Sequence, residues 1–222
     1  MTTTTVDEIL VELAALEEPK ARAINERHGD DHGVNLSKLR AIAKRLKIQP
    51  ELARKLWKTD NTPAKLLALL ISRPKDYSAA ELDQMLRQAR VPKVRDWLVN
   101  YMAKKHPDAE ALRLRWFDDP DQYLASAGWE LTADRVQKRP EGLNLGGLLD
   151  QIESEMKDAP APLQWSMNTN LAYIGIKNQD LRPRALAIGE RLEVLKDYPT
   201  PPNCTSPFAP IWINEMVGRQ EK

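Results

Sequence analysis

A carboxylate among basic side chains marks residues 91–105 as the part of the chain that could do chemistry. Asp96 is flanked by Lys93 and Arg95 and stands four residues before Asn100, off the apolar stripe of this predicted helix. A carboxylate on a basic surface can stabilise positive charge that develops on a sugar. The simpler interpretation is an acid near a helix start, favoured there by the macrodipole and by local ion pairs, and the residues alone favour it.

Two other groups have residue types that metal sites and nucleophiles use. His28 and His32 are four residues apart. Gly29 and Gly33 interrupt this segment, which predicts a helix-ending turn instead of two metal ligands on one helix face. Cys204, the only cysteine, has no histidine near it in the sequence, so we expect a packed thiol and not a nucleophile. Neither a metal site nor a cofactor is expected.

Short motifs that define several enzyme classes are absent from the sequence. There is no Walker A motif, no GxGxxG and no GxSxG, which removes most nucleotide hydrolases, dinucleotide oxidoreductases and serine hydrolases from consideration. No stretch approaches the roughly 20 apolar residues of a membrane span. The first ten residues, MTTTTVDEIL, lack the basic and apolar regions of a secretory signal. With a single cysteine as well, we expect a cytoplasmic protein, in a bacterial-type cytosol or nucleoid.

Charge is unevenly distributed along the chain, although its total is close to neutral. The 222 residues include 33 Lys and Arg and 32 Asp and Glu, for a net charge of +1. Residues 32–105 hold 17 basic and 6 acidic residues, a net of +11, and each flank has a net of −5. A basic segment of this kind indicates a surface that faces a polyanion. Exposed helix faces in any protein also carry Lys and Arg, so charge alone leaves both interpretations open.

Helices must position these side chains, because the apolar residues repeat with helical periodicity almost throughout. No run alternates apolar and polar β-branched residues, so strands are not expected. Capping boxes at Thr5–Glu8 and Ser78–Glu81 and a proline at position 63 mark helix starts. The predicted helices include residues 6–16, 64–71, 121–135, 143–156, 162–176 and 184–195.

The predicted helices are short, number about ten to twelve, and pair at intervals of roughly 35–40 residues. This pattern predicts an all-α fold, a HEAT-like-repeat α-solenoid in which helix pairs stack and present one long concave face. A compact helical bundle is the alternative that periodicity leaves open. We expect the solenoid domain to span residues 1–197.

A proline-rich extension, residues 198–222, is expected to follow the solenoid. Five prolines between residues 198 and 210 exclude a long regular helix there. Phe208, Ile211 and the two residues after it are too apolar for a loose tail. We therefore expect this segment to pack back on the solenoid and to cover its core. A peptide that docks on a partner protein is the alternative.

Residues 33–46, GVNLSKLRAIAKRL, are similar to the opening motif of the DNA alkylation repair proteins of the AlkD type. The pattern of that family is a Gly-Val turn followed by a Leu-Arg-x-x-Ala-Lys helix. Residues 51–57 and 64–71 resemble the next helices of the family, and residues 180–192 resemble its last one. The resemblance covers roughly residues 5–195 and is most specific in the first third.

The resemblance implies a HEAT-like-repeat solenoid that holds duplex DNA in a basic concave groove. Characterised members of the family are DNA glycosylases that excise cationic N3- and N7-alkylated purines, and unlike most glycosylases they do not draw the base into a pocket. In these enzymes a carboxylate near the deoxyribose stabilises the oxocarbenium-like transition state. Tryptophans pack on the sugar-phosphate backbone, and neither a metal nor a cofactor takes part.

The family motif Trp-Asp-x-x-Asp places its catalytic carboxylate at Asp96 when the helix ends are aligned. The Trp of the motif then falls on Pro92 and its first Asp on Lys93. A family Arg falls near residues 125–127, where no Arg stands, and a second family Trp falls near Asn170. The resemblance therefore carries over one catalytic residue, Asp96, and leaves the other positions unmatched.

Three tryptophans are candidate substitutes for the missing aromatic groups, namely Trp97, Trp129 and Trp165, although each is more simply interpreted as core. Trp165 stands just over one turn before the aligned position. The residues that we expect to contact DNA come from the basic segment, with one aromatic from the second half: Lys38, Lys44, Arg45, Lys93, Arg95, Lys104, Lys105 and Trp165. A non-catalytic helical-repeat scaffold that binds nucleic acid or a protein is the alternative function.

Overall fold

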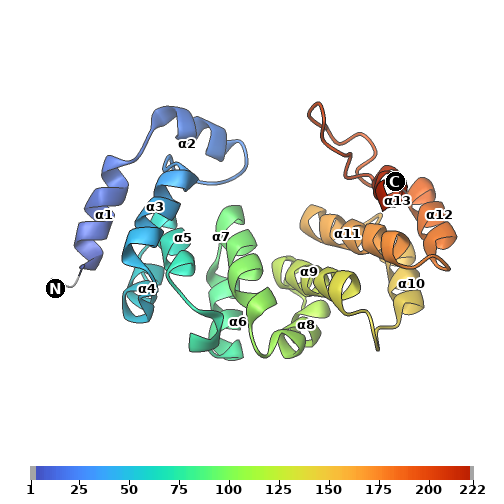
Figure 1. Ribbon diagram of the computed structural model, residues 1–222, viewed down its shortest axis with the longest axis horizontal. Helices are drawn as coiled ribbons and strands as arrows, with labels where there is room; N and C mark the ends of the chain where they lie inside the picture. Colours follow the sequence, from blue (N-terminus) through green and yellow to red (C-terminus); the bar gives the residue numbers. More distant parts are fainter. Residues whose placement is uncertain (1–3, 221–222) are drawn as a thin grey trace. The chain divides into compact units, whose positions relative to one another are not determined.

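The computed structural model describes residues 4–220 of the chain (Figure 1). The regular elements in that range are thirteen α-helices, two 3-10 turns and one π-helical turn. A single antiparallel bridge joins Glu17 to Val34, and these described residues form no strand. The all-α prediction is confirmed. The described residues form one helix more than the upper end of the expected ten to twelve, and α2 (Pro19–Glu26), which buries none of its residues, is one that was not expected.

The chain folds as two compact units, Met1–Ala109 and Glu110–Lys222. The boundary expected at residue 197 stays a prediction, since the division into units concerns compactness and not the extent of the repeats. The elements of the first unit are α1 (Val6–Ala15), α2, α3 (Leu36–Leu46), α4 (Pro50–Trp57), α5 (Thr62–Leu70), η1 (Pro74–Asp76), α6 (Ala79–Gln88), α7 (Pro92–Trp97), η2 (Leu98–Met102) and η3 (Ala103–Lys105).

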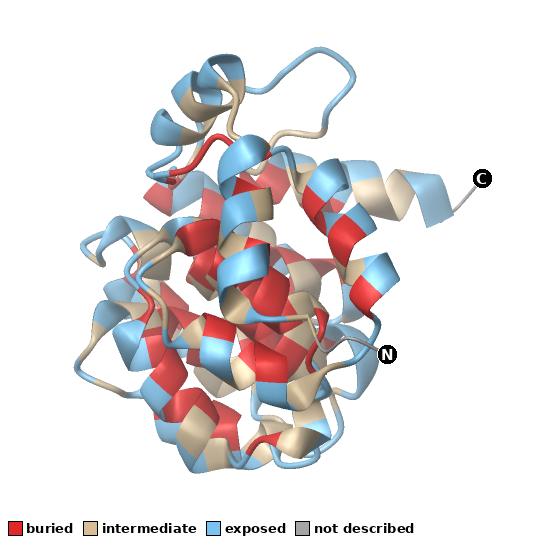
Figure 2. Ribbon diagram, turned by 90° about the vertical axis from the view of Figure 1, so that its left-hand side faces the viewer, coloured by how far each residue is buried: buried red, intermediate tan, exposed pale blue. Residues whose placement is uncertain are grey.

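Helix α5 forms the centre of the first unit. All but one of its residues between Thr62 and Leu69 are buried, and it packs against α1, α3, α4 and α7. The surrounding helices bury one face each, so that buried and exposed residues alternate along them (Figure 2). Because α5 is enclosed, the helices around it carry the side chains that can meet a ligand.

Helix starts in the first unit follow the capping signals of the sequence. The side chains of Thr5 and Ser78 each accept a hydrogen bond from a backbone N–H in the first turn, and the side chain of a glutamate three residues later accepts one from the N–H of the capping residue. Both predicted capping boxes are therefore confirmed. Asn61 caps α5 by accepting from the N–H of Ala64 at 2.9 Å, with Pro63 in the first turn. The cap moves the start of α5 to Thr62, two residues before the predicted one.

The second unit is arranged around α11. This helix packs against every one of its neighbours from α9 onward, and its own buried residues run from Ser166 to Ile176. Gly128 lets α9 approach α8 closely, because an added Cβ would lie 2.5 Å from the backbone nitrogen of Phe117. The helices of this unit are α8 (Ala109–Phe117), α9 (Gln122–Lys138), α10 (Leu145–Glu155), α11 (Ala161–Lys177), α12 (Arg182–Leu192) and α13 (Ala209–Gln220).

The predicted helix 184–195 differs most from its structural counterpart. Helix α12 begins at Arg182, with Pro183 in its first turn, and ends at Leu192. Its last turn stops because Glu193 adopts a left-handed conformation with φ 54°. No glycine marks this end, so the sequence has no signal for it. The predicted helix 143–156 begins at Leu145 because Asn144 caps it.

The proline-rich segment contains no helix until Ala209, where α13 begins. Phe208, Ala209 and Ile213 are buried, and α13 packs against α11 and α12 within the second unit. The side-chain amide of Asn168 donates to the carbonyl of Pro207 at 2.8 Å and holds the end of the loop. The expectation of a packed thiol was wrong: Cys204 is exposed, because the surrounding loop has no regular element that could cover it.

Candidate functional site

The loop before α3 fixes the start of α7, the helix that carries Asp96. Asp30 is buried in this loop and accepts a hydrogen bond at 2.9 Å from the backbone N–H of Lys93. Such an acceptor satisfies an N–H that the helix itself leaves unpaired, and its charge complements the macrodipole. Gly29, with φ 80°, completes the contact, because an added Cβ would lie 3.2 Å from Cγ of Pro92. The helix-ending turn predicted here is confirmed.

The two histidines of this loop do not form a metal site with a third ligand. His32 is buried, and the side-chain amide of Asn25 donates to its carbonyl at 2.8 Å. Burial lowers the pKa of His32, although Asp30 and Glu17 act in the opposite direction. His28 is exposed. Across residues 4–220 no three His, Cys, Asp or Glu side chains are grouped as metal ligands.

A row of polar side chains runs along the helix that begins with α7. Asn100 donates to the carboxylate of Asp96 at 2.7 Å and to its backbone carbonyl at 2.9 Å. Lys104 then donates to the amide oxygen of Asn100 at 2.7 Å. The spacing of four residues places all three on one side of the helix. Asp96 is exposed, so the row holds a solvated carboxylate in a defined place, with a cation at its far end.

The backbone changes from α to π geometry in the middle of this row. The turn η2 includes Asn100, and the first residue after it, Ala103, opens the 3-10 turn that carries Lys104. The side-chain amide of Asn100 supplies a donor to the Asp96 carbonyl within this altered hydrogen-bond pattern. Single π-helical turns inside α-helices are frequent at functional sites.

Two cations lie on aromatic rings beside the row. Trp97 and Tyr101 form an edge-to-face pair with centroids 5.2 Å apart. The guanidinium of Arg40 lies 5.2 Å from the Trp97 ring, and the ammonium of Lys105 lies 5.3 Å from the Tyr101 ring. Arg40 belongs to α3, so this contact places one cation of α3 against α7. Arg40 stands in the segment of residues 33–46 that resembles the family motif, and that motif alone predicts no role for it.

The acidic N-terminal flank pairs with two of the expected phosphate-binding residues on α3. Lys38 forms an ion pair with Glu18, and Arg45 forms one with Glu12 at 2.5 Å. The hydrogen bond from Glu12 raises the pKa of Arg45. Lys44 is exposed and has no ion pair with any residue in the described range. The charge that α3 offers to an anion is therefore smaller than its composition suggests.

Lys93 and Arg95, two of the expected DNA-contacting residues, also make hydrogen bonds that hold the start of α7. Arg95 folds back so that its guanidinium donates to the carbonyls of Ala89 and Arg90, where α6 has just ended. A cation at that place complements the C-terminal end of a helix. Lys93 contributes its backbone N–H to Asp30. That either side chain binds phosphate stays a prediction.

The candidate tryptophans differ in exposure. Trp97 and Trp129 are buried, as the core interpretation requires. Trp165 is 43% exposed and meets Tyr198 edge to face with centroids 5.1 Å apart, so the core interpretation is wrong for this residue. It lies at the start of α11, in the second unit, where the chain keeps an aromatic pair at its surface.

The other aligned family positions lie in the interior of the second unit. Asn170 is fully buried, and its amide donates to the carbonyl of Trp129 at 2.8 Å. Residues 125–127 are small and buried at the contact between α9 and α11. Close packing of these two helices leaves no room for a long side chain at either place, so neither substitutes for the family residue.

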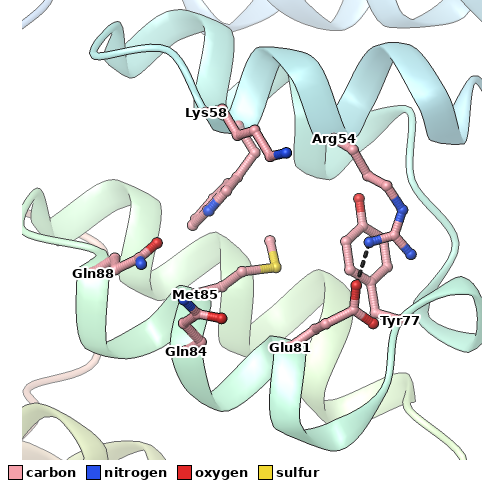
Figure 3. A pocket seen from close by; sticks show the side chains of 8 residues that line it. Arg54, Lys58, Tyr77, Glu81, Gln84, Met85 and Gln88 are labelled. Atoms are coloured by element: carbon pink, nitrogen blue, oxygen red, sulfur yellow. Dashed lines mark hydrogen bonds and ion pairs between the residues drawn. The ribbon is translucent and has the colours of Figure 1, made fainter.

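The first unit also contains a cavity of about 320 Å³ that no motif in the sequence signals. Opposed faces of α4 and α6 form it, with the segment between η1 and α6 at one end (Figure 3). On α4 and just after it the lining residues are spaced i, i+3, i+4, and on α6 they are spaced i, i+3, i+4, i+7, as one helix face requires. The lining residues are Arg54, Trp57, Lys58, Tyr77, Glu81, Gln84, Met85 and Gln88.

The chain matches known proteins along most of its length. Residues 9–213 match the family model of the DNA alkylation repair enzymes. The uncharacterized protein Lin0241 of Listeria innocua is 23% identical over 224 residues, which cover 97% of this chain and 98% of that protein. The uncharacterized protein Lmo0209 of Listeria monocytogenes is 25% identical over 191 residues, which cover 82% of this chain and 84% of that protein.

A solved structure has a similar fold. It comes from "a new family of proteins related to the HEAT-like repeat DNA glycosylases with affinity for branched DNA structures". The TM-score is 0.78 at 22% sequence identity, over 98% of this chain and 95% of that chain. The fold is therefore the all-α HEAT-like repeat fold that the sequence predicts. None of the helices among residues 4–220 is long and apolar enough to cross a membrane.

Proposed function

Because the chain belongs to the family of DNA alkylation repair enzymes, we propose that it binds DNA through the phosphate backbone. The polar row of Asp96, Asn100 and Lys104 carries this proposal, since it lies beside cations from two helices. Backbone binding needs a cluster of Lys and Arg and little apolar contact. Residues 32–105 supply that cluster, with a net charge of +11.

Lys44, Lys104 and Lys105 are the side chains best suited to hold phosphates. Lys44 is exposed on α3, and Lys105 is exposed at the end of η3. The ammonium group of Lys104 donates to the side-chain oxygen of Asn100, and this bond directs the lysine side chain along the row. Arg40 adds a guanidinium that is already desolvated on one side by Trp97, and a planar guanidinium suits phosphate oxygens. Lys44, Lys104 and Lys105 come from the sequence prediction, and Arg40 is added because of its contact with Trp97.

The finer proposal is excision of cationic N3- or N7-alkylated purines. The glycosidic bond breaks, and its electron pair goes to the purine nitrogen. The alkylated purine, which was cationic, then leaves as a neutral base. Asp96 stabilises the positive charge on the sugar that remains, and Asn100 holds the carboxylate where the sugar passes. Water then adds to the sugar carbon and releases a proton. An alkylated purine is already a good leaving group, so the chain's own carboxylate suffices for this step.

A second candidate function is DNA binding without excision. Pro92 stands at the first turn of α7, where the family motif has a tryptophan. A pyrrolidine ring offers no aromatic face to the sugar-phosphate backbone, so one group of the family pattern is missing beside Asp96. The solved structure with the similar fold comes from a family with affinity for branched DNA. Recognition of DNA shape is therefore the alternative to base removal.

Replacing Asp96 by Asn separates the two functions. The amide keeps the shape and an oxygen for the bond from Asn100 but removes the charge. We expect the native chain to release 7-methylguanine from duplex DNA above the spontaneous rate, and Asp96→Asn to lose about tenfold or more of that rate while still binding duplex. Asp118→Asn, an exposed position in the second unit, is the matched control. No release by the native protein in large excess would reject excision and leave the binding function.

A further inference from the structure

We propose that the cavity between α4 and α6 is a second binding site, which takes one unpaired nucleotide of a DNA strand. The proposal deepens the proposed function in that its ligand is DNA, but it uses none of the side chains around Asp96. The cavity volume of about 320 Å³ lies at the lower end of the roughly 300–1,000 Å³ of ligand sites in proteins. A site of this size suits one base with its sugar.

Two apolar side chains from opposite helices provide a surface on which a base can stack. Trp57 ends α4 and is only partly buried. Met85 is buried in α6, and its thioether extends toward α4 across the cavity (Figure 3). An indole and a polarisable sulfur both pack well on an aromatic ring, and stacking on aromatic side chains accepts every base.

Two side-chain amides stand where the edge of that base would lie. Gln84 and Gln88 line the cavity from successive turns of α6 (Figure 3). Neither amide makes a hydrogen bond to any residue that the structure describes, and both are exposed. Each offers a donor and an acceptor, the combination that reads the hydrogen-bonding edge of a base.

One cation at the cavity is available for a phosphate. The guanidinium of Arg54 is not available for a phosphate, because it pairs with Glu81 and lies 4.4 Å from the ring of Tyr77. Lys58 has no ion pair among the described residues, and its ammonium group extends over the cavity (Figure 3). A second hollow of about 280 Å³ shares Trp57, Lys58 and Gln88 and adds Lys65, which forms an ion pair with Asp60 at 3.8 Å. The strand can therefore continue past the stacked base beside Lys58.

The shape of the site selects an unpaired nucleotide. A base inside a duplex is stacked on both faces and paired along its edge, so it has no free face for Trp57 and no free edge for the amides. An unpaired base presents both at once. A free nucleotide has the same chemistry, so the experiment must separate it from a strand.

The test measures binding of three ligands to the full-length protein: an unpaired strand of about ten deoxyadenosines, a blunt duplex and free dAMP. The variants are Gln84→Ala with Gln88→Ala, and Lys58→Gln. Lys55→Gln is the matched control, because Lys55 is exposed on α4 but does not line the cavity. Binding is followed by the change in tryptophan fluorescence, and Trp57→Phe shows whether that change comes from the cavity. Thermal unfolding checks that each variant folds.

We expect the cavity variants to weaken strand binding about tenfold, the scale of one lost stacking or edge contact, and to change duplex binding by less than about twofold. The expected affinity for dAMP is far below that for the strand. Strand binding that the variants do not change would overturn the proposal, as would tight binding of dAMP without the strand. Strand binding that depends on the cavity while duplex does not bind would reject the proposed function alone, and binding of neither would reject both.

Discussion

At the scale of single residues, Asp96 illustrates what spacing can and cannot predict. Its place four residues before Asn100 was readable from the sequence, and the hydrogen bond between the two side chains follows directly from helical geometry. The contact of Arg40 with Trp97 could not be predicted from the sequence, because it joins α3 to α7 across 57 residues. Local pairs within a helix can be predicted from sequence, whereas pairs between helices require the packing.

The ion pairs between α3 and the acidic flank before residue 32 could not be predicted from the sequence either. Glu12 forms an ion pair with Arg45, and Glu18 forms one with Lys38. DNA phosphates must therefore compete with two carboxylates for these cations. We expect Glu12→Gln combined with Glu18→Gln to tighten duplex binding at low salt by about fivefold, because exposed pairs are each worth up to about 1 kcal/mol.

Fluorescence anisotropy of a labelled duplex measures this change. Glu26→Gln in the same flank is the matched control, since its pair with Arg22 is 3.8 Å long and does not involve α3. The control removes one carboxylate and the double variant removes two, so a tightening no larger than the square of the control's factor would mean that overall charge, and not release of Lys38 and Arg45, sets the affinity.

At the scale of elements, capping was the most predictable feature. Both capping boxes and the proline in the first turn of α5 appear in the structure as the sequence indicates. The cap of α7 was not predictable, because Asp30 comes from a loop 63 residues away. The same limit applies to the cavity: each face of α4 and α6 is regular in sequence, but their opposition is a property of the fold.

Helices α8 and α9 are joined by a carboxylate that two arginines share. Glu110 accepts from Arg113 and pairs with Arg135 at 2.7 Å. These bonds, that from Arg113 first, lower the pKa of Glu110 to about 2. A carboxylate with a lowered pKa stabilises the native state above its ordinary pKa of about 4.5, and this contribution disappears as the pH falls toward 2.

Replacing Glu110 by Gln should therefore lower the free energy of unfolding at neutral pH by about 1 kcal/mol, a modest figure because the side chain is 45% exposed. The difference between native and variant should shrink between pH 4.5 and pH 2. Denaturant titrations at several pH values measure it, with Asp118→Asn as the control. A difference that stays constant over this range would show that Glu110 acts by packing and not by charge.

At the scale of the whole molecule, the distribution of charge supports the proposed DNA binding. The total of +1 conceals a segment of +11, and the whole of that segment lies in the first compact unit. The all-α class and the HEAT-like repeat were predictable because helical periodicity and caps recur along the chain. The end of α12 at Glu193, the exposure of Cys204 and that of Trp165 were not, since each depends on local backbone or packing that composition does not encode.

The most direct test of backbone binding is the salt dependence of duplex affinity for the native protein and for Lys44→Gln and Lys105→Gln. Each phosphate contact contributes a slope of about −0.9 to the logarithm of affinity against the logarithm of salt concentration. With three or more contacts we predict a native slope of about −3 or steeper, reduced in magnitude by about 1 in each variant. An affinity that does not change with salt, or slopes that the two variants leave unaltered, would contradict DNA binding by the surface around Asp96.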